Sequence, residues 1–125
     1  MNKLLEEVTA FLKEYEKAAN SHVFDNVKPL ISDDAVYWFS DGSHVGIEQI
    51  EKAFINTFNK IRDENYMIKD VKWLVLENNF AVCIYHFAWK GIVNGKFKEG
   101  HGRGTNVISK SSERWVIIHE HLSIE

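Results

Sequence analysis

Cysteine is almost missing from this sequence, since Cys83 is the only one among 125 residues. A disulfide within the chain is therefore excluded, and the apolar run around Cys83 predicts a buried thiol of the core. Long apolar runs are also lacking, which excludes a spanning helix and makes a membrane an unexpected partner. The N-terminal stretch carries charges throughout and lacks the apolar core of a signal peptide, so we expect a cytoplasmic protein.

An excess of positive charge is lacking too. The chain has 15 Lys and Arg residues against 18 Asp and Glu residues, a net charge of −3, and no basic cluster. This balance argues against nucleic acid as a partner. There is one proline and no linker-like segment, and the length suits one domain over residues 1–125. With 45% hydrophobic residues, the chain can bury a real core.

Helices are predicted in the first half of the chain. Apolar residues recur at three- and four-residue spacing from Leu4 to Ala19, which predicts an amphipathic helix that ends near Asn20. A second, short helix is predicted over 24–31, and a strand over 35–39. Gly46 then precedes a third helix with one apolar face, made of Ile47, Ile50, Phe54, Phe58 and Ile61.

Strands are predicted for the remainder, and the turns between them are short. The expected strands cover 71–76, 80–90, 97–109 and 115–123. Strands joined by short turns pair antiparallel. Helices followed by a strand meander indicate an α+β fold, with three N-terminal helices packed on one face of a curved antiparallel sheet.

The last two strands form a hairpin whose side chains alternate between two faces. In strict alternation, one face of the final strand holds Trp115, Ile117, His119, His121 and Ser123, and the other holds Val116, Ile118, Glu120 and Leu122. Imidazole groups beside an aromatic ring, with Arg103 and Thr105 on the preceding strand, are typical of a small-molecule pocket.

Two motifs carry a resemblance to a known superfamily. The sequence resembles nuclear-transport-factor-2-like proteins in two pairs of segments. One pair is Gly102-Arg103-Gly104-Thr105 with the ending Trp115–Ser123. The other is the earlier Asp33-Asp34-Ala35-Val36 with Gly46-Ile47-Glu48-Gln49-Ile50. This superfamily includes the ketosteroid isomerases and the SnoaL-like polyketide cyclases. The ending is also similar to the association domain of calcium/calmodulin-dependent kinases, a non-catalytic assembly module. The resemblance implies a cone-shaped fold, which hosts many unrelated activities.

The resemblance to ketosteroid isomerases extends to the first helix. Tyr15 and Asn20 stand at the spacing of that family's oxyanion-hole tyrosine and the asparagine after it. The same mechanism needs an aspartate base and a protonated aspartic acid. Trp38 and Phe39 occupy the expected place of the base, and no aspartate follows Asp70. The sequence therefore argues against that mechanism, and it leaves open whether the protein is an enzyme.

His119 and His121 are the catalytic candidates that remain, because a neutral imidazole accepts a proton near pH 7. The alternative is that neighbouring hydroxyl and carbonyl groups simply hydrogen-bond both rings. His86 or His101 could complete a three-nitrogen metal site, but no carboxylate is placed to join it, since Glu120 alternates away from both histidines. We therefore expect neither a metal nor a cofactor.

Arg103 is the candidate anchor for a ligand, because its flanking glycines let a ligand approach the backbone. A cavity-facing guanidinium would bind a carboxylate; the alternatives are a salt bridge to an acid such as Glu99, or a solvated position. Alternation does not decide whether Tyr37 or Trp38 faces the pocket. The expected ligand-binding set is Tyr15, Tyr37, Trp38, Phe54, Phe58, Tyr85, Trp89, Arg103, Thr105, Trp115, His119 and His121.

The sequence thus predicts a small-molecule-binding protein with a partly apolar pocket for an anionic organic ligand such as a carboxylic acid. One alternative is a histidine-based isomerase, cyclase or dehydratase that acts on a carbonyl or polyketide-like substrate. Another is a non-catalytic oligomerisation module. The strand from Phe80 is apolar on both faces, and three helices cover only one. A second copy is therefore expected to cover the other face in a homodimer.

Overall fold

The computed structural model describes residues 2–125. The helical elements are α1 (Lys3–Asn20), α2 (Phe24–Val27), the 3₁₀ helix η1 (Lys28–Leu30) and α3 (Ile47–Lys60). The strands are β1 (Ile31–Phe39), β2 (Gly42–Val45), β3 (Arg62–Leu76), β4 (Phe80–Val93), β5 (Lys96–Ser111) and β6 (Arg114–Ile124).

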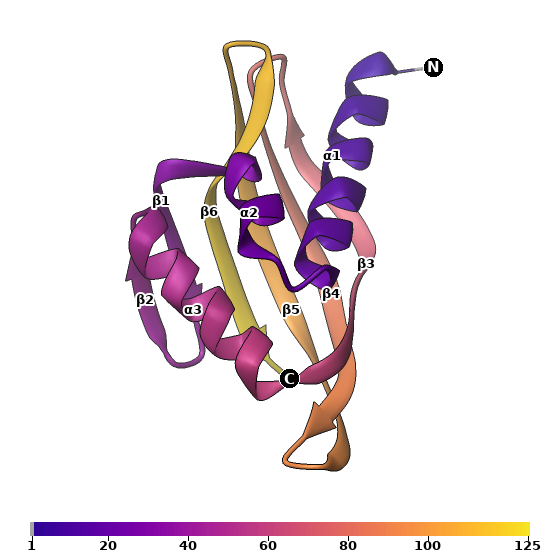
Figure 1. Cartoon of the computed structure of the whole chain (residues 1–125). Coiled ribbons are helices and arrows are strands. Elements are labelled where there is room, and N and C mark those ends of the chain that lie inside the picture. Colours follow the sequence, from indigo (N-terminus) through magenta and orange to yellow (C-terminus); the bar gives the residue numbers. More distant parts are fainter. Residues whose placement is uncertain (1) are drawn as a thin grey trace.

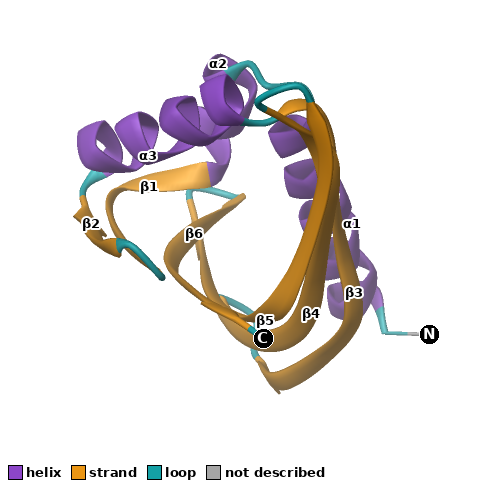
Figure 2. Ribbon diagram, turned by 90° about the horizontal axis from the view of Figure 1, so that it is seen from below, coloured by secondary structure: helices purple, strands orange, loops and turns teal. Residues whose placement is uncertain are grey.

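The six strands form one sheet in the order β2-β1-β6-β5-β4-β3. Every neighbouring pair is antiparallel except β1 and β6, which run parallel. Figure 2 shows that the sheet is strongly curved, and in Figure 1 the helices lie on one side of it. The predicted α+β fold, with helices on one face of a curved sheet, is confirmed.

Helix α1 has the amphipathic pattern that its sequence predicts. The side chain of Asn2 accepts hydrogen bonds from the backbone N–H groups of Leu4 and Leu5, which caps the first turn. The helix ends at Asn20, as predicted. Its buried face packs on the concave side of the sheet and consists of Val8, Phe11, Leu12, Tyr15 and Ala18.

Two element boundaries differ from prediction. The second helix is split, because Pro29 lies in the tighter turn of η1. Strand β3 begins at Arg62, well before the predicted residue 71. Asp63 and Asp70 both adopt positive φ, at 53° and 57°, next to shifts in the pairing register with β4. These irregularities break the two-residue alternation that sequence analysis relies on.

A β-bulge in β6 overturns the predicted faces of the last strand. Ile117 pairs with Ile108 and His119 pairs with Val107, so Ile118 is an extra residue without a partner on β5. Beyond the bulge the alternation is inverted. Trp115 and Ile117 face the core as Glu120 does, whereas His119 and His121 face the opposite side. The prediction that the tryptophan and the two histidines share a face is therefore wrong.

The convex side of the sheet carries exposed apolar side chains, as the two-sided pattern of the strands predicted. Exposed apolar residues on this side include Trp38, Val75, Phe80, Ile84 and Ile118. Cys83 points to the opposite, core side, where burial raises the pKa of its thiol to about 12. Among residues 2–125, no helix has the length and apolar character needed to cross a membrane.

Candidate functional site

A buried carboxyl group, that of Glu120, collects two chains of hydrogen bonds on the concave side. The Tyr15 hydroxyl donates to its Oε1 at 3.0 Å, and Nδ2 of Asn106 donates to the same oxygen at 3.1 Å. The Tyr37 hydroxyl lies 2.8 Å from that of Tyr15, whose own proton is used, so Tyr37 donates. The Tyr85 hydroxyl donates to Oδ1 of Asn106 at 2.8 Å. Two hydrogen-bond chains, with neutral donors from four different elements, therefore end on one oxygen of Glu120.

The charge state of Glu120 is set by its burial. The residue is 2% exposed. Desolvation raises the pKa of its carboxyl group to about 7, although the hydrogen bonds that Tyr15 and Asn106 donate to it oppose the rise. Burial also raises the pKa of the three buried tyrosines well above the usual value, so they remain neutral donors. A buried carboxyl group that titrates near neutrality is a candidate for binding or proton transfer.

Glu120 lies at a cavity of about 560 Å³ between the helices and the sheet. The cavity wall is mostly apolar and includes Phe39, Phe54, Phe58, Tyr66, Phe87, Trp89 and Leu122. Its other charged residues are Asp41, Lys60, Glu64, Lys98 and Glu99. Both donors bind Oε1 of Glu120, and among residues 2–125 no hydrogen bond ends on its Oε2. A cavity of this size with a mostly apolar wall suits a small organic molecule.

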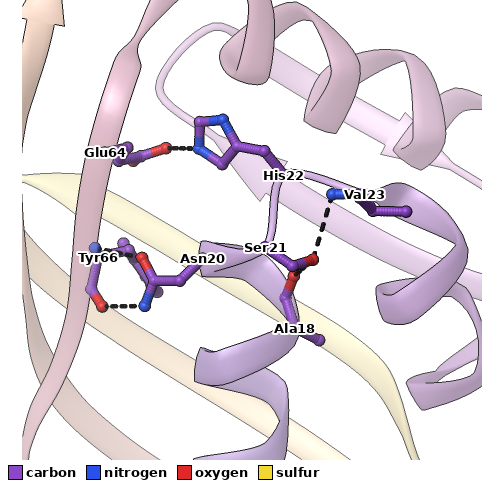
Figure 3. Close-up of polar contacts among 7 residues, drawn as sticks. All are labelled: Ala18, Asn20, Ser21, His22, Val23, Glu64 and Tyr66. Atoms are coloured by element: carbon purple, nitrogen blue, oxygen red, sulfur yellow. Dashed lines mark hydrogen bonds and ion pairs between the residues drawn. The ribbon is translucent and has the colours of Figure 1, made fainter.

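Helix α1 is fastened to the edge strand β3 beside this cavity. The Asn20 side chain donates to the backbone oxygen of Tyr66 at 2.8 Å and accepts from its backbone nitrogen at 2.7 Å (Figure 3). Further along the strand, Glu16 accepts from the backbone nitrogen of Ile68 at 2.7 Å. These contacts satisfy an edge that would otherwise be open to pairing with another chain. Asn20, which sequence analysis paired with Tyr15, thus positions the cavity wall.

His22 and Glu64 form a second polar contact at the cavity wall. Nε2 of His22 lies 2.8 Å from Oε1 of Glu64 (Figure 3). The imidazole ring stacks on Phe58 with 4.3 Å between centroids. Burial raises the pKa of the Glu64 carboxyl group, and the hydrogen bond from His22 opposes this. This pair joins the end of α1 to the start of β3.

The structure places half of the expected ligand-binding set on the concave side. Tyr15, Phe54, Phe58 and Trp89 line the cavity. Tyr37 and Tyr85 are buried behind it in the hydrogen-bond network. The structure also answers the open question in β1, because Tyr37 faces inward and Trp38 outward, with 47% exposure.

The catalytic candidates of the sequence lie on the convex side, away from the cavity. Trp38 stands edge-on to the rings of His119 and His121, at 5.1 and 5.6 Å between centroids. Nδ1 of His119 lies 2.7 Å from the backbone oxygen of Val36, which agrees with the alternative that neighbouring groups satisfy the ring. Among the described residues, 2–125, no three His, Cys, Asp or Glu side chains are grouped to hold a metal.

Arg103 also lies outside the cavity. Its side chain is 67% exposed, and its Nε is 3.5 Å from Oε2 of Glu125 rather than paired with Glu99. Thr105 alternates with Gly104 and Asn106, which places it on the same outer side as Arg103. The expectation that Arg103 and Thr105 face the pocket is therefore wrong.

The glycines beside Arg103 make room for aromatic rings and not for a ligand. Gly100, Gly102 and Gly104 stand opposite Trp89, Phe87 and Tyr85 on β4. A Cβ atom at Gly102 would lie 2.7 Å from the Phe87 ring, and one at Gly100 would lie 2.5 Å from Nε1 of Trp89. Each ring thus lies over a position that lacks a side chain.

Trp115 is buried at the other end of the sheet. Its Nε1 donates to Oε1 of Glu7 at 3.1 Å, and Nζ of Lys110 donates to the same oxygen at 3.1 Å. The ring lines a separate groove between α1, η1 and the start of β6. Trp115 is therefore not part of the cavity that holds Glu120, contrary to expectation.

The predicted site lacked Glu120, Asn106, Tyr66 and Glu64. Glu120 was correctly predicted to lie opposite the histidines, but the histidine face was taken as the pocket. The available signal was a glutamate between Ile118 and Leu122, on the apolar set of the final strand. A charge in such a setting needs a functional or structural reason.

Comparisons with known proteins agree with this architecture. A model of the SnoaL-like domain matches residues 8–125. A nuclear-transport-factor-2-like protein from Salmonella enterica is 21% identical, with a TM-score of 0.88 over 97% of this chain and 90% of that one. A candidate calcium/calmodulin-dependent protein kinase II association domain from Xanthomonas campestris is 25% identical, with a TM-score of 0.85 over 95% and 86%.

The association domain of the kinase from C. elegans is 17% identical, with a TM-score of 0.77 over 94% of this chain and 93% of that one. No curated protein matches the chain. Because the matched model spans nearly all of the sequence, including the cavity-lining residues and Glu120, the chain belongs to the SnoaL-like domain family.

Proposed function

We propose that the protein binds a small organic molecule in the cavity and contacts its polar group through Glu120. The observation that carries the proposal is a buried carboxyl group at an aromatic-walled cavity. Two donors bind one of its oxygens, and no hydrogen bond from residues 2–125 ends on the other. Ligand sites in proteins combine such apolar walls with a few fixed polar groups. The sequence led us to expect an anionic ligand, but the expected anchor, Arg103, is outside, and a carboxylate at Glu120 disfavours anions.

A matched pair of ligands tests the charge preference. At pH 8, 1-naphthaleneacetamide is expected to raise the melting temperature more than 1-naphthaleneacetate, because the ionised Glu120 repels a second carboxylate. Differential scanning fluorimetry on the wild type and on Arg103→Ala measures both shifts. A larger shift from the acid, lost in Arg103→Ala, would restore the anion anchor and refute this assignment.

Proton transfer is a second candidate function. It is supported by the pKa of Glu120, about 7, at which a carboxyl group is balanced between acid and base. Glu120 would then take the role that the sequence gave to a histidine, in an isomerase, cyclase or dehydratase. The Tyr15 proton is directed at Glu120, so Tyr15 is not free to stabilise an oxyanion on a substrate as the ketosteroid isomerase mechanism requires.

If the protein turns over a member of a carbonyl or polyketide-like panel, Glu120→Gln is expected to reduce kcat/KM by a factor of about 100 or more. His119→Ala is expected to retain activity, since that ring faces the convex side. Stopped-flow or steady-state assays on both variants separate the two assignments. Activity that depends on His119 and survives Glu120→Gln would place the chemistry on the other face.

Self-assembly into a homodimer is supported by the exposed apolar residues of the convex side and by the likeness to association domains. Exposed apolar residues gathered on one face are typical of protein interaction sites. We expect light scattering with size exclusion to give a dimer at micromolar concentration. Ile118→Glu is expected to dissociate it, because Ile118 is 40% exposed there, whereas Lys52→Glu on α3 should have no effect. A wild-type monomer would refute the proposal.

A further inference from the structure

We propose that the ligand of this cavity is a hydrophobic amine, whose ammonium group supplies the positive partner that Glu120 lacks within the chain. The inference rests on the proposed function of the cavity and goes further by naming the class of ligand. Its first support is the direction of the hydrogen bonds. Tyr37 donates to Tyr15 and Tyr15 to Glu120, while Tyr85 donates to Asn106 and Asn106 to Glu120.

The three tyrosine hydroxyl protons and one N–H proton of Asn106 are therefore directed along the two chains to Oε1 of Glu120. The network offers a ligand an acceptor, and none of its hydroxyl protons is left over for a ligand carbonyl or carboxylate. Polarised in this direction, the chains stabilise the ionised form of the carboxyl group. The complementary group on a ligand is a donor, and a charged donor forms the stronger bond.

The second support is the absence of a counter-charge. Among residues 2–125, no Lys, Arg or His side chain forms an ion pair with Glu120. The titratable groups that face it from α1, β1, β3 and β4 are all uncharged at neutral pH, because burial raises the pKa of each: Tyr15, Tyr37, Tyr66, Tyr85 and Cys83. From β5 it accepts a hydrogen bond from the neutral amide of Asn106. Lys98 and Glu99 of β5 and Lys60 of α3 line the same cavity without forming an ion pair with it. A buried charge without a partner is costly, and a bound cation removes that cost.

The third support is the composition of the cavity wall. Aromatic faces attract an ammonium group, and seven aromatic side chains line the cavity: Tyr15, Phe39, Phe54, Phe58, Tyr66, Phe87 and Trp89. The other charged residues of the wall add three acidic side chains against two lysines. Both features favour a cation with an apolar body, and a volume of about 560 Å³ admits one of two fused rings.

The proposal predicts a coupling between binding and protonation. The amine binds the ionised form of Glu120, whose pKa is about 7 in the free protein. About a tenth of the molecules are in that form at pH 6 and about nine tenths at pH 8, so the apparent affinity rises about tenfold between them. An aliphatic amine stays protonated throughout this range, as lysine does. The change in apparent affinity therefore comes from the titration of Glu120 and not from the ligand.

Isothermal titration calorimetry at pH 6 and pH 8 tests this with three probes that share one apolar body. The probes are 2-(1-naphthyl)ethylamine, 2-(1-naphthyl)ethanol and 1-naphthaleneacetate. We expect the amine to bind most tightly at pH 8 and about tenfold more weakly at pH 6. The alcohol should change by less than threefold, and the acid should bind most weakly at pH 8. Titrations in buffers of different ionisation enthalpy should show net proton release with the amine near pH 7.

Three variants identify the group responsible. Glu120→Gln should bring the amine to the affinity of the alcohol and remove its pH dependence, while Arg103→Ala should leave both unchanged. If Glu64→Gln removes the tenfold change and Glu120→Gln does not, the ammonium partner is wrongly assigned. If the alcohol binds and the amine is weaker at both pH values, the amine is refuted while the cavity still binds ligands. If none of the three binds at millimolar concentration, the proposed function fails as well.

Discussion

Glu120→Gln is expected to make the ligand-free protein more stable than the wild type above pH 7. In the unfolded chain the carboxyl group titrates near its ordinary value of 4.5, and in the folded protein near 7. Between these values the folded state holds a proton that the unfolded state has lost, so the stability of the wild type falls as pH rises. The full loss corresponds to about 3 kcal/mol, and glutamine does not undergo it.

Urea unfolding of both proteins from pH 4.5 to pH 8.5 measures this difference. Because all other titrating groups are common to the two proteins, the difference in unfolding free energy isolates Glu120. It should grow steadily through the window and level off above pH 7. Glutamine can still accept from Tyr15 and Asn106, so the network keeps its geometry. A difference that does not vary with pH would show that the folded-state pKa is not raised.

Gly102→Ala is expected to destabilise the protein by about 3 kcal/mol or more. A Cβ atom at this position would overlap the backbone oxygen of Ser123 on β6 and lie 2.7 Å from the Phe87 ring on β4. A ring can shift, but the backbone oxygen moves only if β6 moves away from β5. Overpacking a core usually costs 1–3 kcal/mol, and displacing a paired strand adds to that.

Chemical denaturation of Gly102→Ala beside Arg103→Ala measures this effect. Arg103 is the next residue on the same strand and points outward, so its truncation should change stability by less than about 0.5 kcal/mol. Equal, small effects in the two variants would mean that β5 and β6 are not packed as closely as described. A failure of Gly102→Ala to fold, with Arg103→Ala intact, agrees with the prediction.

The fold could be predicted because its determinants are local. The helical spacing in α1 and α3, and the short turns after β3, fix the element types and the antiparallel pairing of β3 to β6. The periodicity of the sequence does not predict how the sheet curves. That curvature was expected from the resemblance to the cone-shaped superfamily. The start of β3 was not predicted correctly, because Asp63 and Asp70 have positive φ values that interrupt the alternation of its side chains.

The site was predicted only in part, because a single inserted residue inverted the final strand. Residues that depend on helical spacing or on the uninterrupted strand β4, such as Phe54, Phe58 and Trp89, were placed correctly at the cavity. Residues beyond Ile118 were assigned to the wrong side, since a bulge leaves no simple sign in the sequence. Arg103 was assigned to the pocket for another reason, because its flanking glycines were taken as room for a ligand. They make room for aromatic rings on the neighbouring strand, and the alternation along one strand does not reveal this.

The titration of the Glu120 carboxyl carbon tests the central claim most directly. Carbon-detected NMR on protein labelled with ¹³C at the glutamate side chains, with Glu120→Gln to assign the signal, follows this one group from pH 4 to pH 9. The account predicts a midpoint near pH 7 for the free protein and a lower midpoint when 2-(1-naphthyl)ethylamine is bound. A midpoint near the ordinary value of 4.5, unmoved by the amine, would contradict it.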